Sequence, residues 1–198
     1  VIDTYSDVAH HAVEVEGGGT RFGSGEAMIE RIDLLSASGE STSLVYPGDP
    51  VRLRLHYRAK ERIESPVFGA SIDTREGVFV WGLHGMDACY VPTSIEPGTG
   101  HLDIEIPRLT FNPGAYTISA AIQNHDMTGV IDALQKARRF DVLPGPGMES
   151  GGLVNLGASF TGLTPARPMR DVPKRGAADY ENLARMQAQQ ADALENED

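Results

Sequence analysis

The chain has 198 residues, 40% of them hydrophobic, which is enough to bury the core of one domain with extensions at its ends. A formal net charge of −11 disfavours binding to nucleic-acid phosphates or to anionic lipid through bulk electrostatics. The sequence has no secretory signal and no apolar run long enough to span a membrane, and it begins at Val1, so we expect a soluble piece of a longer protein.

Two kinds of sequence pattern follow one another along the chain. Residues 1–21 are acidic and glycine-rich without a sustained period of 2 or 3.6, so we expect a flexible connector there. From residue 22 to 160, short alternating segments are separated by turn-forming triplets at residues 37–39, 47–49, 75–77, 96–98, 112–114 and 127–129. Because no helical pattern intervenes, the sequence predicts an all-β antiparallel sandwich of the immunoglobulin-like or jelly-roll kind over residues 22–160.

Two strands have a clear pattern of alternation. Residues 51–60 place apolar side chains on one face and basic ones on the other, the latter being Arg52, Arg54, His56 and Arg58. Residues 116–124 place large apolar side chains on one face and Thr117, Ser119, Ala121 and Gln123 on the other. This second face is small and polar, which is typical of a sheet surface that faces a ligand.

The C-terminal part changes character after Val142. Residues 143–152 are too rich in proline and glycine for regular structure, and they tether a last apolar strand predicted at residues 153–160. A strand on such a tether can complete its own sheet or that of a second copy, which predicts a strand-swapped homodimer. Residues 161–198 have too few apolar side chains to bury a helix face, so we expect a tail that is disordered or helical only against a partner.

Patterns for catalysis, metals and cofactors are missing. The glycines of residues 17–25 lack the Gly-Lys-Ser/Thr of a phosphate-binding loop, and no Gly-x-Ser-x-Gly precedes a helix. The histidines lack ligand spacing, and the single Cys89 excludes an internal disulfide and agrees with a reducing compartment. We therefore expect no enzyme activity, no cofactor and no metal.

Several segments together carry a family resemblance. They are RFGSGEAMIERIDL at residues 21–34, VRLRLHYRAK at 51–60, SPVFGASIDTREGVFVWG at 65–82, FNPGAYTISAAIQNHD at 111–126 and GGLVNLGASF at 151–160. In this order they resemble the C-terminal domain of Wzt-type proteins, the ATP-binding subunits of ABC transporters that export O-antigen polysaccharide. The resemblance implies a non-catalytic carbohydrate-binding domain that recognises the non-reducing end of a polysaccharide. It also implies a cytoplasmic place at the inner face of the bacterial plasma membrane, a swapped dimer, and contact with the transmembrane subunit through an ATPase domain that this chain lacks.

Sugars are bound by aromatic faces and by planar polar side chains, which defines the candidate binding residues. They are Asp73, Trp81, His84 and Tyr90 in one stretch, Gln123 and His125 in another, and Arg54 and His56 on the basic strand. Each has a structural alternative, since Trp81 is also suited to the core of a sandwich and Arg54 and His56 to a solvated sheet face. Turn formation alone accounts equally well for His125.

Two other classes of function stay open. The sandwich could serve only oligomerisation, with the tail as a partner helix, or it could be a sugar-processing enzyme. The enzyme would need two carboxylates that converge in a groove, which 28 acidic residues neither indicate nor exclude.

Overall fold

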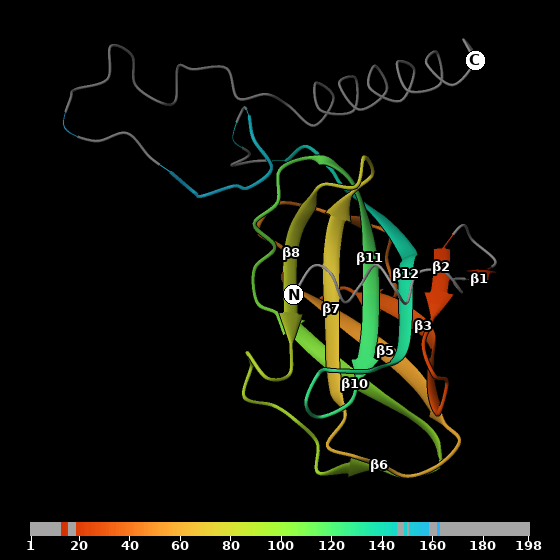
Figure 1. The fold of residues 1–198 in the computed structure, drawn as a ribbon. Coiled ribbons are helices and arrows are strands. Elements are labelled where there is room, and N and C mark those ends of the chain that lie inside the picture. Colours follow the sequence, from red (N-terminus) through yellow and green to blue (C-terminus); the bar gives the residue numbers. More distant parts are fainter. Residues whose placement is uncertain (1–12, 16–18, 146–148, 150, 159–161, 163–198) are drawn as a thin grey trace, which may run out of the picture.

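The computed structural model describes residues 13–15, 19–145, 149, 151–158 and 162. All regular secondary structure in these residues is β, and the strands form two facing sheets (Figure 1). This arrangement confirms the predicted all-β sandwich.

The larger sheet contains seven strands. Six of them run in the order β1 (Val13–Val15), β2 (Gly19–Phe22), β12 (Val130–Val142), β11 (Gly114–Gln123), β7 (Val67–Thr74) and β8 (Phe79–His84), all antiparallel to their neighbours. The seventh, β4 (Leu44–Val45), pairs in parallel with the end of β12. Since β2 begins at Gly19, the sheet extends into the residues predicted as a connector.

The smaller sheet has three strands and lies behind the larger one in Figure 1. Its order is β10 (Gly98–Ile106), β5 (Val51–Ala59) and β3 (Ala27–Leu35). A separate pair joins β6 (Ile63–Glu64) to β9 (Ser94–Ile95).

The core lies between the two sheets and follows the predicted alternation. Leu53 and Leu55 of β5 are fully buried, as are Ile118 and Ile122 of β11. Tyr116 stacks with Phe111 and Phe140, at centroid distances of 5.2 and 5.5 Å, and its hydroxyl donates to the carbonyl of Asn112 at 2.7 Å. This bond spans four residues, as in the tyrosine corner of Greek-key sandwiches.

The predicted strand at residues 153–160 is wrong for the part that the structure describes. Over residues 153–158 the one β pairing is the isolated bridge between Val154 and Phe111, both of which lie outside the strands. The Asn112 side chain donates to the carbonyls of Gly151 and Gly152, which holds the segment as an irregular loop. Leu156 is 81% exposed, so the apolar residues of this segment do not complete the core of their own chain.

The described residues contain no helix with the length and hydropathy that a membrane crossing requires. The predicted tail, residues 161–198, lies outside the described residues apart from Gly162.

Candidate functional site

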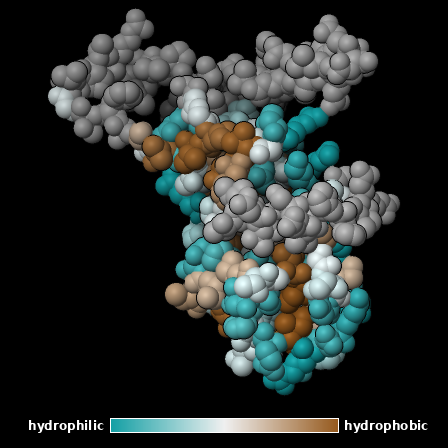
Figure 2. Space-filling model, in the orientation of Figure 1, coloured by the Kyte–Doolittle hydropathy of each residue, from teal (hydrophilic) through white to brown (hydrophobic). Residues whose placement is uncertain are grey.

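The outer face of the larger sheet, on the side away from the core, is floored by small side chains. Strand pairing places three rows of residues on it: His84, Gly69, Ala121 and Ala133; then Gly82, Ser71 and Ser119; then Phe79, Asp73, Thr117 and Arg139. Figure 2 views the molecule from this side and shows hydrophobic and hydrophilic areas side by side beyond the grey atoms. We call this surface, made of β7, β8, β11 and β12, the outer face.

Four of the predicted site residues gather at one end of this sheet. Because β8 and β11 both run antiparallel to β7, their last residues, His84 and Gln123, lie at the same end. Tyr90 follows β8 in a loop that is closed by the hydrogen bond from its N–H to the carbonyl of Gly85, at 2.8 Å. His125 is exposed in the turn between β11 and β12.

The loop after β8 also contacts His84 directly. The Nε2 atom of His84 lies 3.1 Å from a carboxylate oxygen of Asp87. Asp87 therefore orients the imidazole at the rim of the outer face.

Asp73 lies farther along the outer face, beside Thr117. Partial burial raises the pKa of the Asp73 carboxyl, and the positive charge of Lys136 opposes this rise. Among the described residues the carboxylate has no hydrogen bond or ion pair. Thr117 is 6% exposed, and its buried hydroxyl oxygen also has no hydrogen-bond partner there. The Asp73 carboxylate is thus left for a ligand or water to satisfy, while the Thr117 hydroxyl lies beneath the surface.

A β-bulge shapes the middle of the outer face. Where β12 passes Ser119, the register shifts and Lys136 takes a φ of 51°, in the left-handed region. Its N–H donates to the Ser119 hydroxyl at 2.9 Å instead of to a strand carbonyl. The bulge brings a lysine to the small-residue floor.

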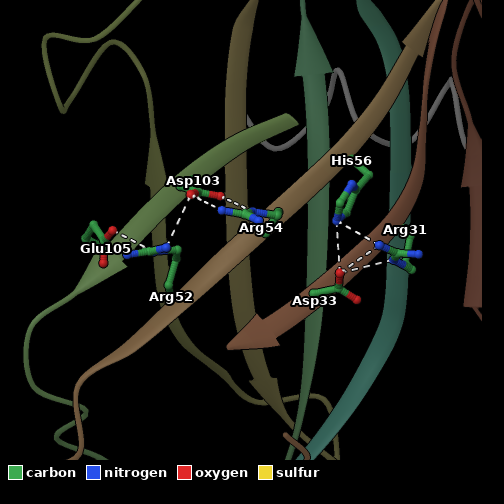
Figure 3. A network of polar contacts seen from close by, with 7 residues as sticks. All are labelled: Arg31, Asp33, Arg52, Arg54, His56, Asp103 and Glu105. Atoms are coloured by element: carbon green, nitrogen blue, oxygen red, sulfur yellow. Dashed lines mark hydrogen bonds and ion pairs between the residues drawn. The ribbon is translucent and has the colours of Figure 1, made fainter. Parts of the chain in front are cut away.

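Arg54 and His56 do not join these residues, because they lie on the outer face of the smaller sheet, at the opposite side of the sandwich (Figure 3). Arg54 donates two hydrogen bonds to Asp103, both at 2.8 Å, and the Nε2 atom of His56 lies 2.9 Å from Asp33. The hydrogen bond from Arg54 holds the pKa of Asp103 below its usual range.

The charged side chains of β5 on this second face are paired with carboxylates of the neighbouring strands. Arg52 is 2.6 Å from Glu105, and the guanidinium of Arg58 pairs with Glu30 at the other end of β5. Each of these arginines has a carboxylate partner one strand away. This matches a solvated sheet face whose charges are mutually neutralised, rather than a free site for an anion.

Trp81 points toward the other side of its sheet. It pairs with Ile72, whose side chain is buried, and packs against the core. A bulge at Val80 shifts the register so that Phe79, two residues before Trp81, pairs with Asp73 on the outer face instead.

Sequence reasoning did not single out Phe79, Ser71, Lys136 or Arg139. Alternation in β7 would have placed Ser71 beside Asp73, so that signal was present in the sequence. Strict alternation puts Phe79 and Trp81 on one face, and only the bulge separates them. Lys136 was missed because it also lies at a bulge, in β12.

No group of three or more histidine, cysteine, aspartate or glutamate side chains in the described part of the chain has a geometry that could hold a metal ion.

Comparison with known proteins places the chain in a family. The family model described as the Wzt C-terminal domain matches residues 19–156. A solved structure titled as the crystal structure of the C-terminal domain of Wzt shares the fold, with a TM-score of 0.67 and 19% identity over 75% of this chain and 90% of that one. A Niemann-Pick type C2 protein from the Japanese carpenter ant reaches a TM-score of 0.44 at 8% identity, covering 66% of this chain and 98% of that one. Comparison with curated proteins gives no match. The match over residues 19–156 spans most of the chain and agrees with the shared fold, so the chain belongs to the Wzt C-terminal domain family.

Proposed function

We propose that this domain binds a polysaccharide on the outer face of its larger sheet and does not hydrolyse it. The observation that carries the proposal is the floor of glycine, serine and alanine side chains across β8, β7 and β11, with His84, Asp73 and Gln123 on the same surface. Small side chains let a sugar chain approach the sheet closely, and the larger polar ones bind its hydroxyls. The Asp73 carboxylate, which is only partly buried and has no hydrogen bond or ion pair with the described residues, is an acceptor that sugar hydroxyls can satisfy.

Family membership supports a place for this binding in polysaccharide export. The resemblance to Wzt-type proteins implies two roles on separate domains. An ATPase domain powers transport, and the C-terminal domain binds the polysaccharide that is exported. In this proposal the cargo is an O-antigen-type polysaccharide, recognised at its non-reducing end on the cytoplasmic side of the membrane. The transmembrane subunit is then contacted through the ATPase domain, and the binding domain acts as a homodimer.

The experiment mixes the purified chain with polysaccharide isolated from the same source. Calorimetry measures binding, and an assay for released reducing ends measures hydrolysis. His84→Ala and Gln123→Ala should each weaken binding by about 1 to 3 kcal/mol, the scale of a lost stacking or buried polar contact. His101→Ala is the matched control, because His101 lies on the outer face of the smaller sheet.

Three outcomes contradict the proposal. They are saturable hydrolysis of the polysaccharide, no retention of any surface glycan, and full binding by a variant that lacks His84, Tyr90 and Gln123 together. The last result would place the binding site elsewhere on the domain.

A further inference from the structure

Phe79 is a large apolar side chain in an unusual position for a sandwich of this size. It is 65% exposed, although it belongs to a regular strand, and it faces outward because of the bulge at Val80. None of the aromatic ring pairs formed by the described residues includes Phe79. Neither core packing nor aromatic pairing therefore accounts for its position.

The Phe79 ring does not project freely into solvent but lies across Gly82. A Cβ atom at position 82 would come within 2.8 Å of Cζ and 3.2 Å of Cε2 of the ring. Position 82 must therefore lack a side chain for the ring to rest there. Gly82 lies on the same outer face, since it pairs with Ser71.

Hydrogen-bonding groups lie next to the ring. Asp73 is the cross-strand partner of Phe79, and Thr117 is the next residue along the same row. The Asp73 carboxylate is partly buried and makes no hydrogen bond or ion pair with the described residues. The Thr117 hydroxyl is buried without a partner among them. A flat apolar surface is thus edged by a partly exposed carboxylate that has no partner among the described residues.

We propose that Phe79, resting on Gly82, is a stacking platform for one pyranose ring, and that Asp73 accepts hydrogen bonds from two hydroxyls at the edge of that ring. The ligand class is a pyranose with an apolar C–H face and neighbouring hydroxyls. Aromatic rings bind such faces because C–H groups pack on the negative face of the π system, and carboxylates accept two hydroxyl protons at once. This inference rests on the proposed function and adds a subsite to it.

The first test measures retention of the full chain on immobilised mannan, galactan and rhamnan, and then the affinity for whichever of these polymers it binds. Phe79→Ala should lower that affinity at least tenfold, and Phe79→Trp should keep or raise it. Tyr46→Ala is the matched control, because Tyr46 is also an exposed aromatic, 47% accessible, but it follows β4, which pairs with β12 and is separated from β8 by β12, β11 and β7. It should bind like the wild type.

The second test uses Gly82→Ala, which places a methyl group where the ring lies. The displaced atoms belong to the end of a side chain, so the fold should survive while the platform is tilted, and affinity should fall about as far as in Phe79→Ala. In a Phe79→Ala background the same change should have no further effect. Thermal unfolding of each variant checks that a loss of affinity does not come from a loss of folding.

The outcomes separate the two proposals. Wild-type affinity in Phe79→Ala, together with weaker binding by His84→Ala, would overturn the platform and leave polysaccharide binding in place. No retention of any of the three polymers or of the source polysaccharide by the wild-type chain would overturn both.

Discussion

At the scale of single residues, Asp132 shows how one buried carboxylate joins three strands. It lies in β12, is 2% exposed, and accepts the N–H of Ile29 in β3 at 2.7 Å. Arg21 of β2 is 3.6 Å away, and its guanidinium also donates to the carbonyl of Ile29. Burial raises the pKa of the Asp132 carboxyl, while the Ile29 N–H and the Arg21 charge oppose the rise.

Removing this carboxylate should cost stability rather than ligand binding. Asp132→Ala leaves the buried N–H of Ile29 without this acceptor and the largely buried guanidinium of Arg21 without its counter-charge, so the free energy of unfolding should fall by about 3 kcal/mol. Urea denaturation measures the loss. Asp141→Ala, at an exposed position of the same strand, should change stability by less than about 0.5 kcal/mol. Equal stability of the two variants would contradict the structural role of Asp132.

Asp103 allows a pH test on the smaller sheet. Its pKa is lowered, first of all by the hydrogen bond from Arg54, so the folded chain holds this carboxyl ionised more strongly than the unfolded chain does. The resulting stabilisation is present above the unfolded pKa of about 3.9 and is lost as pH falls through the lower folded value.

The stability difference between the wild type and Asp103→Asn should therefore be positive at pH 7 and shrink toward zero near pH 2. It should be small, because the pair is partly exposed to solvent. Denaturation curves at several pH values measure it. A difference that stays constant, or grows in acid, would show that Arg54 does not act through the ionised form.

At the scale of strands, the bulge of β12 holds one residue in an unfavourable backbone conformation, which lowers the stability of the fold. Lys136 has a φ of 51°, which an L-residue with a Cβ adopts only at a penalty. Lys136→Gly should therefore raise the free energy of unfolding by about 0.5 to 1 kcal/mol. Lys136→Ala is the control, since it removes the charge but keeps the Cβ. If alanine stabilised the fold as much as glycine, the gain would come from the lysine side chain and not from the backbone.

Regular strands could be predicted from the sequence, while bulges and their consequences could not. The alternation of β5 and β11 is complete, so the inward faces of both strands followed directly from residue order. Alternation fails at Val80, where one extra residue places Phe79 and Trp81 on opposite faces, and around Lys136, where two extra residues of β12 face Ser119. Phe79 was missed for that reason.

The predicted site residues lie on two different sheets, which the sequence did not show for a related reason. Residue order showed that Arg54 and Asp73 face away from the core, but it did not show that they belong to different sheets. Which two faces meet depends on long-range pairing, and the carboxylates that pair with Arg54 and His56 come from β10 and β3. The apolar run at residues 153–160 had strand composition, and yet Asn112 holds its first part in an irregular loop.

At the scale of the whole molecule, the apolar segment after residue 152 is left without a full set of contacts. Leu153, Val154 and Leu156 are all exposed large hydrophobic residues, and the single bridge from Val154 to Phe111 is the only strand-like pairing among described residues 153–158. A monomeric chain gains nothing from three apolar side chains in water. Residues 143–152 are long enough to carry the segment to a second copy, where the same side chains would be buried.

Exchange of this segment should therefore make the chain a dimer. Two copies that swap it satisfy a two-fold axis with contacts that each already makes within one chain, such as those of Asn112 and Phe111, and they add burial of the three apolar side chains. Light scattering should give about twice the chain mass of 21.3 kDa.

A chain that ends at Val142 should become monomeric or insoluble, because Phe111 and its neighbours lose their cover. Leu156→Asp should weaken the dimer while leaving the sandwich folded, since Leu156 is 81% exposed within one chain. A monomer at high concentration, or an unchanged dimer after the truncation, would refute the exchange, and a dimer that survives both changes would have to form through another surface of the sandwich.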